Sequence, residues 1–124
     1  MIKPINKRVV ITGLGLVTPL GIGVKPTWES LCAGKSGVGE ITRFDSSAYA
    51  TKIAAEIKDF DAGALFGRRA ARRNDRFTLF ALHAAREAIA DAELDCDNGA
   101  GQHIGVFIGT AIGGILTLLK NWKM

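Results

Sequence analysis

Five arginines stand close together in the middle of the chain and form its densest charged feature. They are Arg68, Arg69, Arg72, Arg73 and Arg76, with a single acid, Asp75, among them. The chain has 16 basic and 12 acidic residues, and outside this window eleven of each sign cancel. The net charge of +4 therefore comes from nine residues. Such a local basic patch favours an acidic partner that binds at one place.

Residues that could act as nucleophiles, bases or metal ligands are few and scattered. Cys32 and Cys96 form no CxxC pair, and His83 and His103 share no ligand spacing with them. Metal ligands must converge, so the sequence predicts no metal centre. Neither cysteine is flanked by a basic residue of the kind that activates a thiol. On a helical wheel His83 falls on the solvent side, and no catalytic residue is assigned.

Two glycine-containing segments partly match nucleotide-binding motifs. After Gly13 and Gly15, the dinucleotide fingerprint needs a third glycine where Thr18 stands and a helix where Pro19 stands. Residues 34–36 match the end of a phosphate-binding loop, but Glu29 would replace its first glycine and repel phosphate. These departures from both motifs argue against a nucleotide cofactor.

The elements around these residues alternate between strands and helices. Residues 8–13 and 103–109 are short, β-branched and bounded by glycine, which predicts two buried strands. A short helix is expected after Pro26, ending at Gly34, with Trp28 and Leu31 on its apolar side. Loops are predicted at 13–23 and 35–45, and a weaker strand at 52–60. Residues 70–92 predict one long helix, with all five arginines within about 140° of one face and alanines opposite.

This order favours an α/β layered fold, of which the two strands would form only an opening part. A content of 48% hydrophobic and 23% charged residues is ordinary for a globular domain. No run of 18 apolar residues and no secretory signal are found, so we expect a cytoplasmic protein that does not associate with membranes.

Several segments together resemble one enzyme family, the β-ketoacyl-acyl carrier protein synthases. Residues 8–21 resemble the family's first strand and loop, 28–37 its first helix and turn, and 44–52 the segment that follows in the type II elongating enzymes, the subgroup of 3-oxoacyl-[acyl carrier protein] synthase II. Residues 72–77 resemble the start of its long helix, and 109–114 its glycine-rich loop. The likeness covers about residues 8–119 and is expected to end near Lys120.

The resemblance implies a thiolase-like αβαβα fold, a homodimer and a reaction without a cofactor. In the family, a cysteine takes an acyl group as a thioester, and two histidines assist decarboxylation of malonyl-carrier protein. The resulting carbanion then attacks the thioester, for which a thiolate is both a good nucleophile and a good leaving group. The implied partners are acyl carrier protein and the acyl and malonyl thioesters.

The family's catalytic cysteine and histidines lie in characteristic sequence contexts. None of the cysteines and histidines of this chain has a matching context: Cys32, Cys96, His83 and His103. We therefore interpret residues 1–124 as an incomplete N-terminal domain, roughly the first third of such an enzyme, truncated or ending in a frameshifted tail, and inactive alone. By resemblance, Arg69, Arg72 and Arg73 bind carrier protein, although a solvated basic face is the alternative. Ile112 matches a residue that lines and gates the acyl pocket, and plain core packing is its alternative.

Two other functional classes remain. One is a non-catalytic module, or a decayed fragment, that binds acyl carrier protein. The other is a nucleic-acid-binding protein that uses the arginines, but the sequence has no recognised reading motif or interleaved surface aromatics, so nucleic acid is not an expected partner.

Overall fold

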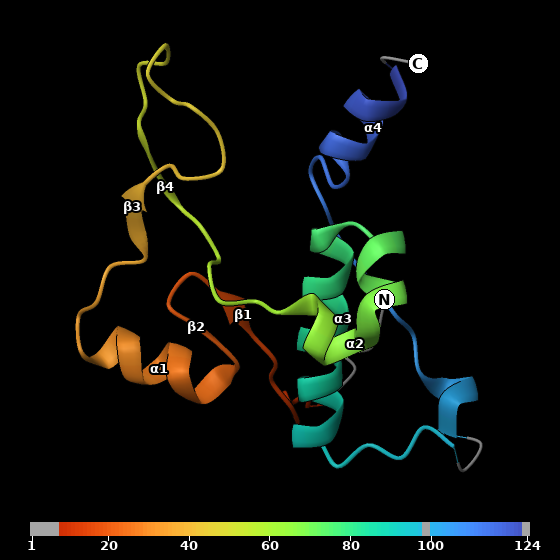
Figure 1. The fold of residues 1–124 in the computed structure, drawn as a ribbon. Helices are drawn as coiled ribbons and strands as arrows, with labels where there is room; N and C mark the ends of the chain where they lie inside the picture. The colour runs from red at the N-terminus through yellow and green to blue at the C-terminus, as the bar shows by residue number, and fades with distance from the viewer. Residues whose placement is uncertain (1–7, 98–99, 123–124) are drawn as a thin grey trace, which may run out of the picture.

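The computed structural model describes residues 8–97 and 100–122 and shows small sheets combined with helices (Figure 1). The element order is β1 (Val17–Thr18), β2 (Gly21–Ile22), α1 (Val24–Cys32), β3 (Val38–Glu40), β4 (Ile53–Ala55), α2 (Ala62–Arg73), α3 (Arg76–Asp91), the 3-10 helix η1 (Ala100–His103) and α4 (Ile115–Trp122). Among the described residues, no helix is both long and apolar enough to cross a membrane.

The ribbon β1–β2 and helix α1 form one packed unit. The two strands pair antiparallel, with Val17 opposite Ile22, so the segment expected to be a loop contains a small hairpin. Helix α1 packs on this ribbon through Thr27, which is 3% exposed and whose hydroxyl donates to Gly23 O at 2.8 Å. Trp28 was expected on the buried side but is 65% exposed, because the contacts of α1 with the ribbon run through its polar face.

The segment at residues 8–16 runs along α3 without forming the predicted buried strand. The backbone N–H groups of Leu14 and Leu16 donate to the carboxylates of Asp91 and Glu87, each at 2.9 Å. A strand needs a neighbouring strand to pair with its backbone groups, and no described strand lies beside residues 8–13. The prediction of a strand at 8–13 is therefore wrong for this structure, and its apolar residues are exposed.

The hairpin β3–β4 occupies part of the segment expected to be a loop. Val38 pairs with Ala55 and Glu40 with Ile53 in antiparallel register. The strand expected within residues 52–60 is confirmed at β4, whereas β3 was missed because its sequence, Val-Gly-Glu, shows no periodicity. Both sheets among the described residues are two-stranded antiparallel ribbons, and neither contains the two strands expected at 8–13 and 103–109.

The expected long helix is two helices. Asn74 and Asp75 both have extended backbone angles, with ψ of 144° and 151°, so α2 ends at Arg73 and α3 begins at Arg76. A further bend lies at Gly67, which has a φ of +81°. Glycine adopts positive φ with little strain because it has no Cβ atom. The alanine-rich stripe of α3 was predicted correctly in part. It receives the N-terminal segment so closely that a Cβ at Gly13 or Gly15 would overlap its backbone.

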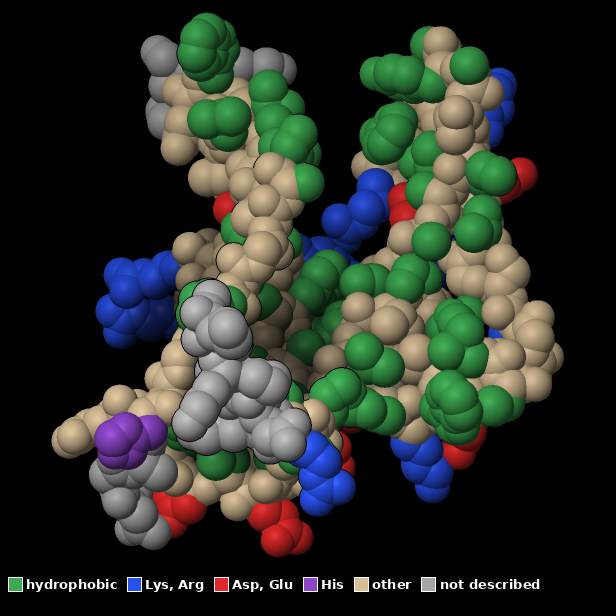
Figure 2. All heavy atoms as spheres, turned by 180° about the vertical axis from the view of Figure 1, so that it is seen from behind, with side chains coloured by type: hydrophobic (Ala, Val, Ile, Leu, Met, Phe, Trp, Pro, Cys, Tyr) green, Lys and Arg blue, Asp and Glu red, His purple; other side chains and the backbone are tan. Residues whose placement is uncertain are grey.

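The C-terminal part lacks the second predicted strand. Residues 104–110 are irregular and exposed, with Phe107 at 98%, because no described strand lies beside them. The core is small: Phe60 and Leu79 are the buried hydrophobic residues of the described chain. In Figure 1 the β3–β4 hairpin and α4 project as two arms, and Figure 2 shows apolar side chains over both arms and the face between them.

Candidate functional site

The four arginines of α2 form an exposed surface, here called the arginine surface (Arg68, Arg69, Arg72 and Arg73). Helix α2 begins at a local cap, because the carboxylate of Asp61 accepts the N–H of Ala64 at 3.0 Å. The bend at Gly67 then starts the turns that carry the arginines. Their side chains line an open groove of about 520 Å³.

The cations of the arginine surface are not neutralised within the described chain. All four side chains are exposed, and none has a hydrogen-bond or ion-pair partner among the described residues. Arg72 and Arg73 occupy the last turn of α2, where the negative end of the helix dipole favours positive charge. The helix therefore tolerates a concentration of like charge and presents it to solvent.

An aromatic cluster holds α2 against α3. The ring of Phe60 is 6% exposed and meets the edge of Phe80 at a centroid distance of 4.8 Å. Phe66 lies 6.4 Å from Phe60, and the Arg86 guanidinium lies 4.7 Å from the centre of the Phe66 ring. His83, expected on the solvent side, packs edge-on against Phe60 at 5.8 Å and is half-buried. It serves as a packing residue of this cluster.

Arg76 does not belong to the arginine surface, contrary to the predicted arc of five cations. Its Nη2 donates to the carbonyl of Ile57 at 2.6 Å, and its guanidinium lies 5.1 Å from the centre of the Phe80 ring. Burial lowers the pKa of Arg76 from its ordinary value, and the positive charge of Arg43 lowers it further. The break at Asn74 and Asp75 turns this arginine toward the aromatic cluster and away from the other four.

Ile112 lies in the loop before α4, and its side chain is 71% exposed. The loop rests on the turn between α2 and α3. A Cβ at Gly113 would come within 2.5 Å of Phe77 Cε2, and one at Gly114 within 2.7 Å of Asp75 Oδ2. The hydroxyl of Thr117 donates to Asp75 Oδ1. Asp75 is a helix N-cap residue recognisable from sequence, but its long-range partners are not, so sequence reasoning missed it.

Among the described residues, the groups that carry nucleophilic or metal chemistry in other proteins are not brought together. Cys32 and Cys96 are exposed free thiols. Within residues 8–97 and 100–122, no three histidine, cysteine, aspartate or glutamate side chains lie close enough to hold a metal ion. The arrangement of the described residues therefore offers a charged surface and an apolar loop rather than a reacting centre.

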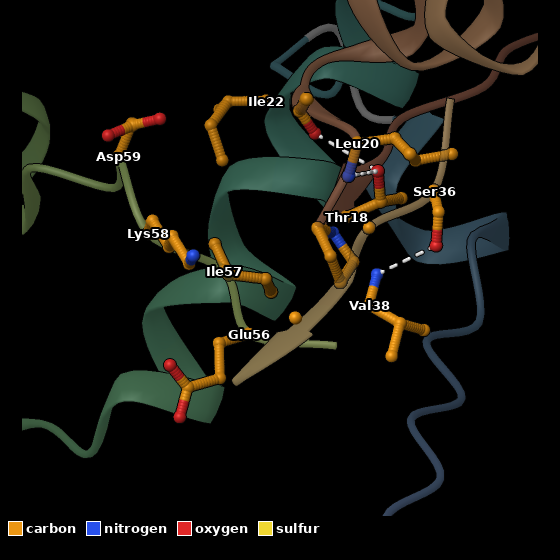
Figure 3. A pocket seen from close by; sticks show the side chains of 13 residues that line it. Thr18, Leu20, Ile22, Ser36, Val38, Glu56, Ile57, Lys58 and Asp59 are labelled. Carbon is orange, nitrogen blue, oxygen red and sulfur yellow. Dashed lines mark hydrogen bonds between the residues drawn. The ribbon is translucent and has the colours of Figure 1, made fainter. Parts of the chain in front are cut away.

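A small polar cavity of about 240 Å³ lies between the β1–β2 turn and the segments around residues 36–39 and 56–59 (Figure 3). Its rim includes Lys58, Asp59 and Glu56. The hydroxyl of Thr42 donates to Glu56 Oε2 at 2.6 Å, and this bond holds the pKa of the Glu56 carboxyl below its ordinary value. Because that carboxylate already bonds Thr42, we assign it a structural role at the base of the β3–β4 hairpin.

Comparison with known proteins gives a consistent set of relatives. A sequence model described as "Beta-ketoacyl synthase, N-terminal domain" matches residues 6–123, which extends past Lys120, where the likeness was expected to end. Proteins named 3-oxoacyl-[acyl-carrier-protein] synthase 2 from Staphylococcus aureus N315, Coxiella burnetii and Synechocystis sp. are each 47% identical, over 112, 117 and 113 residues. These matches cover 90%, 94% and 91% of this chain.

The same matches cover only 27% or 28% of the relatives, so the chain spans a little over a quarter of their length rather than a third. Among solved structures, "The ishigamide ketosynthase/chain length factor" is similar with a TM-score of 0.62 and 36% identity. That match covers 72% of this chain and 22% of the solved chain.

Proposed function

The chain belongs to the β-ketoacyl synthase family through the N-terminal domain, and on that premise we propose that it forms the first part of a 3-oxoacyl-[acyl carrier protein] synthase of fatty acid biosynthesis. The observation that carries the proposal is the 47% identity to three such enzymes over at least nine tenths of this chain. In this proposal the domain is incomplete, and the remaining sequence of the enzyme completes a layered, thiolase-like αβαβα fold and a homodimer.

The proposed reaction joins an acyl thioester to malonyl-carrier protein. A cysteine thiolate holds the acyl group, the malonyl group loses CO2, and the carbanion so formed attacks the thioester carbonyl and releases the thiolate. Hydrogen-bond donors that stabilise the two oxyanions lower both barriers. Because neither cysteine nor either histidine of this chain has the matching context, these groups come from outside it.

The chain itself contributes binding in this proposal. Arg69, Arg72 and Arg73 contact the acidic carrier protein, supported by their exposure and by the absence of a neutralising partner among the described residues. Ile112 contacts the acyl chain, for which its apolar side chain on an exposed loop is suited. A second candidate, a non-catalytic module that binds carrier protein, is supported by the same surface, because all four of its arginines lie on α2.

A chimaeric enzyme tests the proposal. We expect the 124-residue chain alone to produce no 3-oxoacyl product from acyl- and malonyl-carrier protein above a control without protein. In the chimaera, residues 8–119 replace the matching segment of the Staphylococcus aureus relative, and the resulting enzyme should catalyse the condensation. Product from the chain alone would refute the inactivity. A folded chimaera without activity that still binds carrier protein would favour the non-catalytic module.

A further inference from the structure

The turn between α2 and α3 lies between the arginine surface and the loop that carries Ile112, the two regions to which binding is assigned above. Arg73, the last residue of α2, and Asp75 are separated by two Cα steps, at most about 7.6 Å. On its other side this turn meets the loop that carries Ile112. The turn between α2 and α3 therefore contacts the loop that carries Ile112 and is covalently continuous with the arginine surface.

The contacts between the turn and the loop are close and specific. The ring of Phe77 fills the space that a Cβ at Gly113 would occupy, and Asp75 Oδ2 does the same at Gly114, where φ is +76°. At Gly114 a side chain would crowd the Asp75 carboxylate and would also strain this backbone conformation. The hydroxyl of Thr117 then donates to the other oxygen of Asp75.

The carboxylate of Asp75 is used for the loop and not for its own helix. Asp75 stands at the N-cap position of α3, where aspartate usually accepts a hydrogen bond from the first turn, but it makes no such side-chain bond. Helix α3 therefore lacks the N-cap hydrogen bond that aspartate usually supplies. The carboxylate oxygens of Asp75 instead contact Gly114 and accept the hydroxyl of Thr117. A residue that served only to cap α3 would not be oriented in this way.

We propose that Asp75 and Phe77 form a seat that fixes the loop bearing Ile112 relative to the arginine surface. Asp75 is a positioning residue: it holds the loop so that an acyl chain presented by a carrier protein on α2 meets residue 112 in one geometry. The seat itself is a property of this chain, whereas its use for an acyl chain rests on the proposed function.

Hydrogen exchange of the 124-residue chain, at a protein concentration low enough to keep it monomeric, tests the seat directly. The Leu118 N–H donates to Gly114 O at 3.0 Å in the first turn of α4, so its exchange reports on the seated loop. Asp75→Ala should raise the exchange rate of the Leu118 amide by about tenfold, the effect of losing one hydrogen bond. Asp75→Asn retains an acceptor and should restore most of the protection.

Two further variants make the test specific. Thr117→Val should reproduce the effect of Asp75→Ala, and the double variant should add little, because both remove the same bond. Asp91→Asn is the matched control, since this carboxylate lies on the same helix but accepts the N–H of Leu14, and it should leave the exchange rate of the Leu118 amide unchanged. Equal exchange of the Leu118 amide in Asp75→Ala and wild type, or no protection of this amide in wild type, would overturn the proposal.

A distance measurement distinguishes positioning from general stabilisation. Spin labels at residues 68 and 112, with both native cysteines replaced by serine, should give a narrow distribution that broadens in Asp75→Ala and narrows again in Asp75→Asn. A distribution unaffected by residue 75 would overturn the positioning role. Neither hydrogen exchange nor the spin-label distance requires carrier protein. If the chimaera does not bind carrier protein, the proposed function is refuted, and these two measurements still decide whether the seat exists.

Discussion

Arginines that are neighbours in the sequence take opposite physical roles in this chain. Arg72 and Arg73 extend into solvent from the last turn of α2, whereas Arg76 donates to the Ile57 carbonyl and stacks on aromatic rings. Two extended residues between the helices cause this division. Substitution of Arg76 should therefore reduce stability, and substitution of the arginine surface should affect binding alone.

We expect charge reversal on the arginine surface to weaken carrier-protein binding. Each exposed charge pair contributes about 1 kcal/mol or less, so Arg69→Glu with Arg73→Glu, which replaces two attractions by repulsions, should raise Kd by about tenfold or more at low salt. The difference should shrink as added salt screens the charges. Titration calorimetry on the chimaera at two ionic strengths measures both effects.

The matched control reverses two exposed cations elsewhere. Lys25→Glu with Lys35→Glu changes the net charge equally but lies on and just after α1, and should leave Kd nearly unchanged. Unchanged thermal stability in both double variants is required before affinities are compared. Equal affinities of wild type and the Arg69/Arg73 variant at low salt would mean that the arginine surface is only a solvated face.

At the scale of elements, α3 organises the N-terminal third of the chain. Its Glu87 accepts two backbone N–H groups, from Leu16 at 2.9 Å and from Val24 at 2.7 Å. Val24 is the first residue of α1, whose N-cap is Gly23 and has no side chain to cap the helix. Glu87 therefore supplies from another helix the acceptor that a serine or aspartate cap would give locally.

We expect Glu87→Ala to destabilise the packing of residues 14–24 on α3. Two partly buried N–H groups would lose their acceptor, and each unsatisfied group costs about 1–3 kcal/mol when fully buried, so the lower end of that range applies here. Faster amide exchange at Leu16 and Val24 is the measurement. Glu29→Ala, on the exposed face of α1, is the matched control; equal exchange in the two variants would contradict the role of Glu87.

At the scale of the whole molecule, the described residues leave much of their apolar surface uncovered. The most exposed large hydrophobic side chains include Val9, Ile11, Val106, Phe107 and Trp122. Only Phe60 and Leu79 are buried hydrophobic residues of the described chain, and their area cannot offset much of the conformational entropy of ordering the backbone. Apolar patches of this extent promote association.

We therefore expect the isolated 124-residue chain to associate and to unfold without a sharp transition. Sedimentation velocity should show the apparent mass rising with protein concentration, and an apolar dye should bind and fluoresce at low temperature, before heating. Calorimetry should show a broad thermal profile because few contacts are shared across the molecule. A monomeric chain with one cooperative transition would contradict this prediction.

The sequence by itself determined the family, the charge distribution and the local elements with strong signals. Gly34 marked the end of α1, and the helix at residues 76–91 followed from apolar residues that recur every three to four positions. The likeness of ordered motifs identified the family that the comparisons then matched. These features depend on neighbours within a few residues, or on ordered motifs, and both can be read without coordinates.

The tertiary structure decided what depends on distant partners. Residues 8–13 and 103–109 have strand-like composition, but a strand forms only where another strand pairs with it, and no described strand lies beside either segment. The break after Arg73 separates Arg76 from its neighbours, and the approach of Gly113 and Gly114 to Phe77 and Asp75 is likewise invisible to periodicity. Long-range contacts of this kind override local propensity, because burial and hydrogen-bond satisfaction outweigh the few tenths of a kcal/mol that separate local conformations.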